Sequence, residues 1–266
     1  MIPIVYINLE SAVLRRSAID KRLGALGLVG QRIVAVTPAD IPGETLRRHC
    51  DPESYNWLQP AELACSMSHV RAWATLARFG ATHGVVLEDD ACLSDRLPAF
   101  LAGCEQIDRL PDLIRLETSL QALRMERRAE LSIAGVNIHR IHGFAGGSAA
   151  YLISMAMAAR LSRQRRLYEQ PIDFVLFDSF REFPRRTFHH AVPGLAIQSD
   201  KTANSSAAEP SQIKPAYAAR QAARPKSSIR RFLFAARRWI ASEIVTGSGK
   251  TWLDITGRGK RFIDFA

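Results

Sequence analysis

The chain alternates between strand-like and helix-like segments over its first two hundred residues, and this alternation most constrains its fold. Residues 3–9 and 32–36 are rich in β-branched side chains, which suit strands. Between them, residues 12–26 carry apolar side chains near helical spacing, and Gly27 and Gly30 end that pattern. Strands that alternate with helices form a mostly parallel sheet covered by helices. The sequence therefore predicts an α/β fold.

The alternation continues to about residue 198. Pro60 can begin a helix because its fixed φ suits the first turn, and Gly80 follows that helix. One further helix is expected after Ser154 and another after Asp173. Further strands are expected at residues 85–87, 112–116, 149–154 and 187–192.

The helix that begins at Pro60 carries two contrasting faces. Its expected apolar face consists of Leu63, Met67, Val70, Ala74 and Ala77. The neighbouring face, which could look into a site, carries Glu62, Ser66, His69 and Trp73. A histidine and a carboxylate on that face could orient a ligand or act as a base. Their commoner role is to support neighbouring loops through hydrogen bonds.

Positive charge is concentrated at the end of the chain. The chain has 36 Lys and Arg against 26 Asp and Glu, but twelve of the basic and three of the acidic residues lie between Lys214 and Ala266. The preceding part is nearly neutral, with 24 basic and 23 acidic residues. Residues 199–228 are rich in Ala, Ser, Pro and Lys, so we expect a linker or loosely packed segment. Residues 229–266 are expected to form a basic amphipathic tail that begins with a helix.

The composition of this tail is typical of a helix that binds a membrane surface. Basic side chains attract anionic lipid, and each one near the surface contributes about 1 kcal/mol. The same charge could attract nucleic acid. Within the basic stretch, however, Phe232, Leu233, Trp239 and Ile240 form an apolar set that suits lipid better than a phosphate backbone. We therefore expect an anionic membrane surface as partner, and no nucleic acid.

Three consecutive carboxylates, Glu88, Asp89 and Asp90, follow directly after the apolar strand at 85–87. Adjacent carboxylates repel one another unless they share a cation, and their hard oxygen atoms suit Mg²⁺ or Mn²⁺. The end of a strand in an open α/β sheet is also where ligands usually bind. The alternative is a solvated acidic turn. The position after an apolar strand favours a divalent metal site that also binds substrate phosphates.

Other polar residues lie where strands are expected to end. Asn8 ends the first strand and Arg15 follows it, so the two could hold a phosphate or a nucleotide base. Glu117 follows the strand at 112–116. Asp173 lies at the start of a helix, where its default role is to cap that helix.

Six blocks, taken in order, resemble glycosyltransferase family 25, of the lipooligosaccharide β-1,4-galactosyltransferase type. The blocks are Tyr6-Ile-Asn-Leu with Arg15 after it, Glu62-Leu-Ala-Cys-Ser-Met-Ser-His69, Val86-Leu-Glu-Asp-Asp90, Ile114-Arg-Leu-Glu-Thr118, Gly146-Gly-Ser-Ala-Ala-Tyr-Leu-Ile-Ser154 and Pro171-Ile-Asp173. Two positions depart from the family pattern: Gly146-Gly-Ser stands where a Cys-Gly-Thr type is familiar, and Ala61 stands where relatives often have Gly.

The resemblance implies a GT-A-like nucleotide-sugar-binding fold, with residues 1–198 as the catalytic domain. It implies transfer of a hexose, galactose in that type, from a UDP-sugar to a lipopolysaccharide, lipooligosaccharide or other glycan acceptor, with inversion and with Mn²⁺ or Mg²⁺. The residues implied for the metal are Glu88, Asp89 and Asp90, and those implied for the donor pocket are Asn8, Arg15, His69 and Asp89.

Inversion is a single in-line displacement, so a carboxylate must take the proton from the acceptor hydroxyl. Asp173 is the first candidate for this base, and Glu117 is the second. Four cysteines without a CxxC pair suggest reduced thiols. Together with the tail, they suggest a peripheral protein on the cytoplasmic face of the inner membrane. The alternative is a non-catalytic binding module whose tail engages nucleic acid or lipid.

Overall fold

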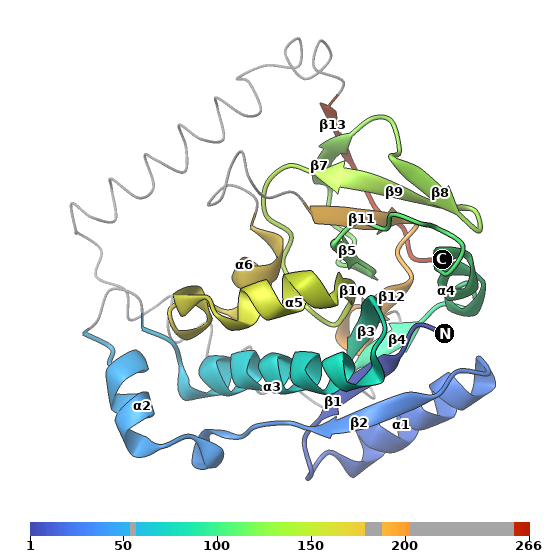
Figure 1. The fold of residues 1–266 in the computed structure, drawn as a ribbon. Coiled ribbons are helices and arrows are strands. Elements are labelled where there is room, and N and C mark those ends of the chain that lie inside the picture. The colour runs from blue at the N-terminus through green and yellow to red at the C-terminus, as the bar shows by residue number, and fades with distance from the viewer. Residues whose placement is uncertain (54–56, 179–187, 203–257) are drawn as a thin grey trace.

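A ten-stranded sheet forms the centre of the structure (Figure 1), and the computed structural model describes residues 1–53, 57–178, 188–202 and 258–266. In spatial order its strands are β13 (Arg258–Arg261), β7 (Leu123–Glu126), β9 (Val136–Ile141), β11 (Phe188–Val192), β5 (Leu113–Arg115), β10 (Ala150–Ser154), β3 (His83–Glu88), β1 (Ile4–Asn8) and β2 (Gly30–Val34), with β8 (Leu131–Ile133) paired to β9. A three-stranded sheet consists of β4 (Ala91–Leu93), β12 (Ala196–Gln198) and β6 (Glu117–Thr118).

The α/β class is confirmed, and the main sheet is mixed. β1 pairs in parallel with β2 and β3, and β5 pairs in parallel with β11. Strand β10 lies between β3 and β5 and runs antiparallel to both. The pairings of β7, β8 and β9 are also antiparallel. A short turn joins β8 to β9, and a short turn can join only antiparallel neighbours. The parallel arrangement therefore holds mainly around β1, where the sequence alternates between strand and helix.

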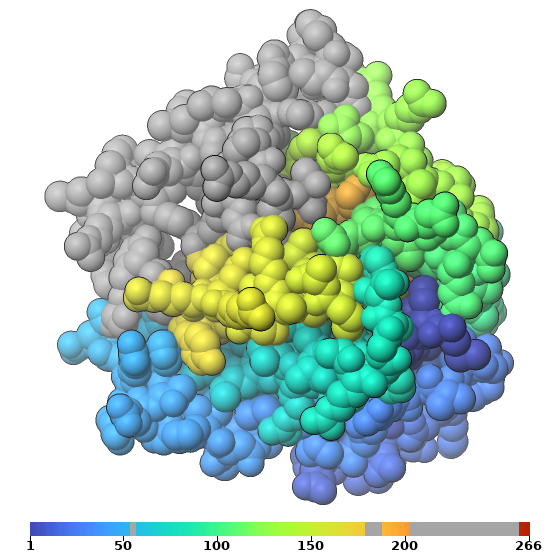
Figure 2. Space-filling view, in the orientation of Figure 1, coloured from blue at the N-terminus to red at the C-terminus, as the bar shows by residue number. Residues whose placement is uncertain are grey.

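Helices cover both faces of the sheet, as the alternating side chains of β1 show. Val5 and Ile7 pack in the cluster that includes Trp73 of α3, while Ile4 and Tyr6 point to the opposite face. The helices are α1 (Val13–Ala25), α2 (Gly43–His49), α3 (Pro60–Leu76), α4 (Leu97–Cys104), α5 (Met155–Ser162) and α6 (Ile172–Phe177). Figure 2 shows α3 and α5 side by side at the surface of one face. Among the described residues, no helix is both long enough and apolar enough to cross a membrane.

Helix α3 begins at Pro60, as the sequence predicts, but its buried face differs from the expected one. Met67 and Val70 are only partly buried and Ala74 is exposed, whereas His69 and Trp73 are buried. The helix packs against both β1 and α5, so the face that carries its polar residues turns toward the protein interior. Hydrogen bonds satisfy part of these buried polar atoms: His69 Nδ1 lies 2.8 Å from the Tyr151 hydroxyl, which accepts a hydrogen bond from Trp73 Nε1. Of the expected apolar face, Leu63 is buried as predicted, whereas the prediction is wrong for Ala74 and Ala77, which are exposed.

Residues 258–266 return to the main sheet. Strand β13 pairs with β7, Ile263 is buried, and the Ile263 carbonyl accepts a hydrogen bond from the Thr118 hydroxyl. These last residues, which the sequence places in the basic tail, therefore pack with the main fold. The rest of the expected tail up to residue 257, including its apolar set, lies outside the described residues, as does the expected linker after Thr202.

Candidate active site

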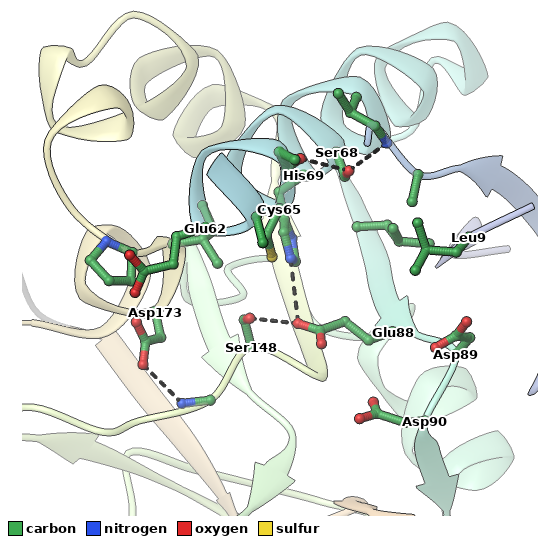
Figure 3. A pocket seen from close by; sticks show the side chains of 18 of the residues that line it. Leu9, Glu62, Cys65, Ser68, His69, Glu88, Asp89, Asp90, Ser148 and Asp173 are labelled. Atoms are coloured by element: carbon green, nitrogen blue, oxygen red, sulfur yellow. Dashed lines mark hydrogen bonds and ion pairs between the residues drawn. The ribbon is translucent and has the colours of Figure 1, made fainter. Parts of the chain in front are cut away.

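A cavity of about 400 Å³ opens where β1 and β3 end, and helix α3, the residues before β10 and the start of α6 complete its wall (Figure 3). Its apolar wall consists of Ile7, Leu9, Ala35, Val36 and Pro38. Its acidic wall carries the carboxylates of Glu62, Glu88, Asp89, Asp90 and Asp173. Among the residues described around it, Arg15 supplies a cationic side chain. The cavity thus joins an apolar surface to a strongly acidic one.

The parallel register of β1 and β3 brings Asn8 next to the acidic triplet. Ile7 lies opposite Glu88, so the residues that follow them, Asn8 and Asp89, are neighbours. Asn8 is buried and donates from Nδ2 to Asp89 Oδ2 at 2.6 Å. Arg15 reaches the same carboxylate, with Nη1 3.4 Å from Asp89 Oδ1. Arg15 lines the cavity, whereas Asn8 acts from behind and orients Asp89.

Glu88 points away from the other two carboxylates of the triplet, toward α3. Its Oε1 accepts a 2.6 Å hydrogen bond from the Ser148 hydroxyl and lies 3.5 Å from His69 Nε2. Burial alone would raise the pKa of Glu88, but His69, Ser148 and Lys201 together hold it below its ordinary value. Glu88 is therefore ionised and already has partners within the protein.

Asp90 has the opposite environment. Its Oδ1 is buried and makes no hydrogen bond within the described part of the chain. Burial and the negative charges of Glu88, Asp89 and Glu117 raise the pKa of Asp90 to about 7, although Arg15 opposes the shift. A buried carboxylate oxygen without a hydrogen bond costs free energy that a bound cation would recover. Of the triplet, Asp90 is thus the side chain best prepared to accept a metal ion.

Asp173 faces Glu88 across the cavity, with Ser148 between them in the view of Figure 3. It lies in the first turn of α6, whose N-cap is Pro171, so it does not occupy the capping position that the sequence suggested as its default. Its Oδ2 accepts a long hydrogen bond from the Gly147 amide, at 3.4 Å. Burial raises the pKa of Asp173 to about 6, and the negative charge of Glu117 adds to this effect. Hydrogen bonds from the Gly147 and Phe174 amides oppose the shift.

Glu117 does not line the cavity, in contrast to Asp173. It is fully buried, and its oxygens lie 3.4 Å from Arg115 Nη2 and 3.2 Å from Lys201 Nζ. It also accepts a 2.9 Å hydrogen bond from the Ala149 amide. With both neighbouring cations engaged, this carboxylate is a poor candidate for the base and a good support for the chain before β10.

The buried Arg115 and Glu117 side chains hold that chain in a conformation only glycine accepts easily. Arg115 donates to the carbonyls of Gly146 and Gly147. Gly147 has φ of +95°, and a Cβ added there would lie 2.6 Å from Glu117 Oε1. The glycines therefore let the chain pass close to Glu117 and place Ser148 against Glu88.

Sequence reasoning missed several residues of the cavity. Cys65 lies one helical turn before His69, so the helical spacing of α3 could have placed it on the wall. Gln198 lies on the wall and Lys201 lies beside Glu117, although both are far along the chain from the other residues of the site. No local sequence pattern could have predicted these two positions. Ser66, which was expected on the same face as His69, is buried and donates to the Glu62 carbonyl instead.

A family model described as glycosyltransferase family 25 (LPS biosynthesis protein) matches residues 1–176. This span contains every candidate site residue from Asn8 to Asp173. The chain belongs to glycosyltransferase family 25. Among curated proteins, none matches the chain significantly.

Membership in glycosyltransferase family 25 identifies the protein as a glycosyltransferase of lipopolysaccharide biosynthesis. Such an enzyme takes a sugar from a nucleotide-sugar donor and transfers it to a glycan acceptor. Family membership favours this enzyme over the non-catalytic binding module that the sequence left open. All the carboxylates that line the cavity lie within the matched residues, and this cavity is the candidate active site.

The raised pKa of Asp173 predicts a pH-dependent cost in stability. A carboxyl group whose pKa rises from 3.8 to about 6 on folding stabilises the protein only while it is protonated, so this contribution is lost as the pH rises through 6. We therefore compare the free energy of unfolding of Asp173→Asn with that of the parent in metal-free buffer. This difference should shift in favour of the variant by about 2 kcal/mol when the pH is raised from 4 to 7. Urea unfolding at both pH values measures this gain.

The matched control is Asp95→Asn, because the Asp95 side chain is 88% exposed. It should show no comparable change between the two pH values. An Asp173→Asn variant whose stability relative to the parent is the same at pH 4 and pH 7 would contradict the assigned environment of Asp173.

Proposed function

We propose that this enzyme is an inverting, metal-dependent hexosyltransferase that uses a UDP-sugar, with galactose as the expected sugar, and a lipopolysaccharide or lipooligosaccharide acceptor. One observation carries the proposal: acidic side chains converge beside an apolar surface in a single cavity where parallel strands end. A pyrophosphate is an anion and would be repelled by this wall unless a cation lay between them. The GT-A-like fold inferred from the resemblance is part of the same proposal.

The residues present fit a divalent metal ion. The unpaired Asp90 Oδ1 and the neighbouring Asp89 offer hard oxygen ligands of the kind that Mn²⁺ and Mg²⁺ prefer. Asp89 and Asp90 would hold the ion, with Glu88 behind them. When bound, the ion would neutralise charge on the diphosphate as the UDP group leaves.

The rest of the wall suits the two ends of the donor. Leu9, Val36 and Pro38 offer an apolar surface for the planar base. Arg15 lines the same cavity beside Asp89, where its guanidinium can donate to a phosphate oxygen. This arrangement would leave the sugar near Ser148 and Asp173.

Asp173 is the proposed base. In the reaction, the acceptor hydroxyl oxygen forms a bond to the anomeric carbon, the bond from that carbon to the diphosphate oxygen breaks, and the hydroxyl proton passes to a carboxylate. A pKa of about 6 keeps Asp173 ionised at neutral pH while making it a stronger base than an ordinary aspartate. Glu117, which the sequence offers as the second candidate, is enclosed by Arg115 and Lys201 and instead supports the glycine turn.

We also propose that residues 229–245 hold the enzyme at the anionic surface that carries a lipid-linked acceptor. Arg230, Arg231, Arg237 and Arg238 lie within this segment among large apolar residues. This part of the proposal rests on the sequence, and it would place the enzyme on the cytoplasmic face of the inner membrane.

Asp90→Asn tests the metal site. Release of UDP from a panel of UDP-sugars that includes UDP-galactose and UDP-glucose should require Mn²⁺ or Mg²⁺ and stop when the metal is chelated. The variant should lose about 10²–10³-fold of this activity, because a neutral amide is a weaker metal ligand and leaves charge on the diphosphate unbalanced. It should keep its circular dichroism spectrum, and Asp95→Asn should keep its activity. Full activity in chelator would refute the proposal.

Asp173→Asn tests the base. The turnover number should fall by about 10²–10⁴-fold while the affinity for UDP stays close to that of the parent, since the residue acts on the acceptor proton. In the parent enzyme kcat/KM should decline as the pH falls below about 6, and the variant should lack that limb of its pH profile. If the variant kept the turnover number of the parent, Asp173 would not be the base.

Sedimentation with vesicles tests the tail. The full chain should bind phosphatidylglycerol vesicles more tightly than phosphatidylcholine vesicles, with affinity that falls as salt is added. Replacing the four arginines with glutamine should weaken binding by about 1 kcal/mol for each. Equal binding to both lipids would contradict an electrostatic anchor.

A further inference from the structure

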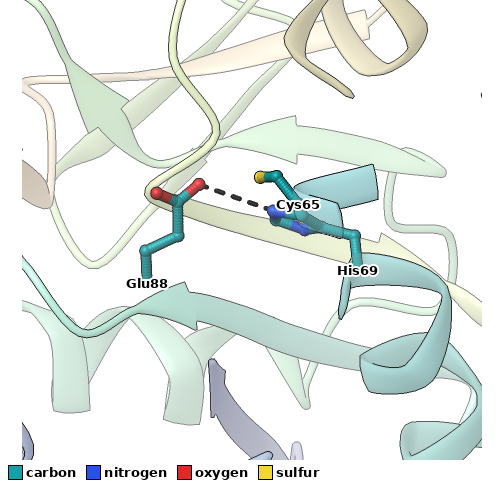
Figure 4. Close-up of side chains that lie close together, drawn as sticks. All are labelled: Cys65, His69 and Glu88. Atoms are coloured by element: carbon teal, nitrogen blue, oxygen red, sulfur yellow. Dashed lines mark ion pairs between the residues drawn. The ribbon is translucent and has the colours of Figure 1, made fainter. Parts of the chain in front are cut away.

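Three side chains of different chemistry meet on the wall of the cavity. Cys65 Sγ, His69 Nε2 and a carboxylate oxygen of Glu88 all lie within 4.8 Å of one another (Figure 4). Cys65 and His69 stand four residues apart on α3, so they project from the same side of the helix. Glu88 reaches them from the end of β3. A thiol, an imidazole and a carboxylate thus converge from two separate elements.

His69 has the orientation that a metal ligand needs. The side chain is fully buried, and its Nδ1 lies 2.8 Å from the Tyr151 hydroxyl, which also accepts a 2.8 Å hydrogen bond from Trp73 Nε1. These contacts fix the ring so that Nε2 points toward Cys65 and Glu88. Nε2 is buried and makes no hydrogen bond within the described residues, although the Glu88 carboxylate lies 3.5 Å away. Metal-bound histidines commonly have their other ring nitrogen held in this way.

We propose that Cys65, His69 and Glu88 form a second cation site, one that binds a thiophilic divalent ion such as Zn²⁺. Sulfur, nitrogen and oxygen ligands together are typical of zinc, whereas Mg²⁺ and Mn²⁺ prefer oxygen alone. Three protein ligands leave a fourth position open toward the cavity. This site differs in its ligands from the oxygen site at Asp89 and Asp90, and it does not depend on which sugar the enzyme transfers.

The geometry and the charge around the site both suit a cation. Tetrahedral zinc places its ligand atoms about 3.3–3.8 Å apart, so side-chain movements of about 1 Å would close the present cluster around an ion. Burial raises the pKa of the Cys65 thiol well above its ordinary value, and the nearby carboxylates, with Glu88 first among them, raise it further. Binding would therefore release the thiol proton to solvent and replace it with the ion, so affinity should increase with pH.

Cobalt binding to the full chain, in the absence of sugar nucleotide, tests the site. Co²⁺ reports on its ligands: a thiolate gives an intense near-ultraviolet charge-transfer band, and tetrahedral geometry gives strong visible bands. The parent protein should show both, and Zn²⁺ should abolish them by competition while excess Mg²⁺ should not. Cys65→Ser should lose the charge-transfer band and bind Zn²⁺ at least tenfold more weakly.

Cys92→Ser is the matched control, because Cys92 lies in β4, outside the cluster, and is also a partly buried free thiol. It should keep the parental spectrum. If Cys65→Ser fails to fold, Glu88→Gln decides: it should weaken Zn²⁺ binding at least tenfold while keeping the thiolate band. Absence of the band in the parent, or its survival in Cys65→Ser, would overturn the proposal. Neither outcome would bear on Mn²⁺-dependent sugar transfer, which relies on Asp90.

Discussion

Repulsion between carboxylates is the constraint on which the site depends. The end of β3, the start of α6 and the first turn of α3 bring acidic side chains to one cavity. The fold compensates each carboxylate differently. Asn8 and Arg15 engage Asp89, Ser148 and His69 engage Glu88, and Asp90 Oδ1 is left without a hydrogen bond. Burial, with the negative charges of neighbouring carboxylates added to it, raises the pKa values of Asp90 and Asp173. Such a cavity favours cations and protons, and perturbed pKa values of this kind are common at functional sites.

A second layer of buried charge holds the cavity in shape. Arg115 and Glu117 lie beneath the glycine turn, and Lys201 joins them from a distant part of the chain. Their contacts fix the carbonyls and amides of the residues before β10, which in turn place Ser148 against Glu88 and the Gly147 amide near Asp173. Removing one partner from such a buried network leaves the others unpaired, so these residues are costly to change even though they do not face the cavity. Glu117 thus lies beneath the wall and holds the chain before β10, whereas Asp173 lines the cavity itself.

Local pattern predicted much of this arrangement, and contacts between distant segments account for the rest. The strand before Glu88 and the helix start at Pro60 follow from short-range signals. The contact between Asn8 and Asp89 does not, because it joins residues 81 positions apart through the parallel register of β1 and β3. The buried face of α3 could not be predicted from its own sequence, because packing against β1 and α5 outweighs the apolar pattern of the helix. The pairing of Glu117 with Lys201 spans 84 residues, and β13 joins β7 from the end of the chain. No local spacing encodes such contacts, so the sequence could not show that Arg115, Lys201 and the Ala149 amide surround Glu117.

Calorimetric titration of UDP into the metal-free protein, with and without Mn²⁺, tests the central claim most directly. The claim is that the acidic wall accepts the diphosphate only through a cation. UDP should therefore bind measurably when Mn²⁺ is present and at least tenfold more weakly in chelator, and uridine, which lacks the diphosphate, should show no such difference. Equal affinity of UDP with Mn²⁺ and with chelator would contradict the account.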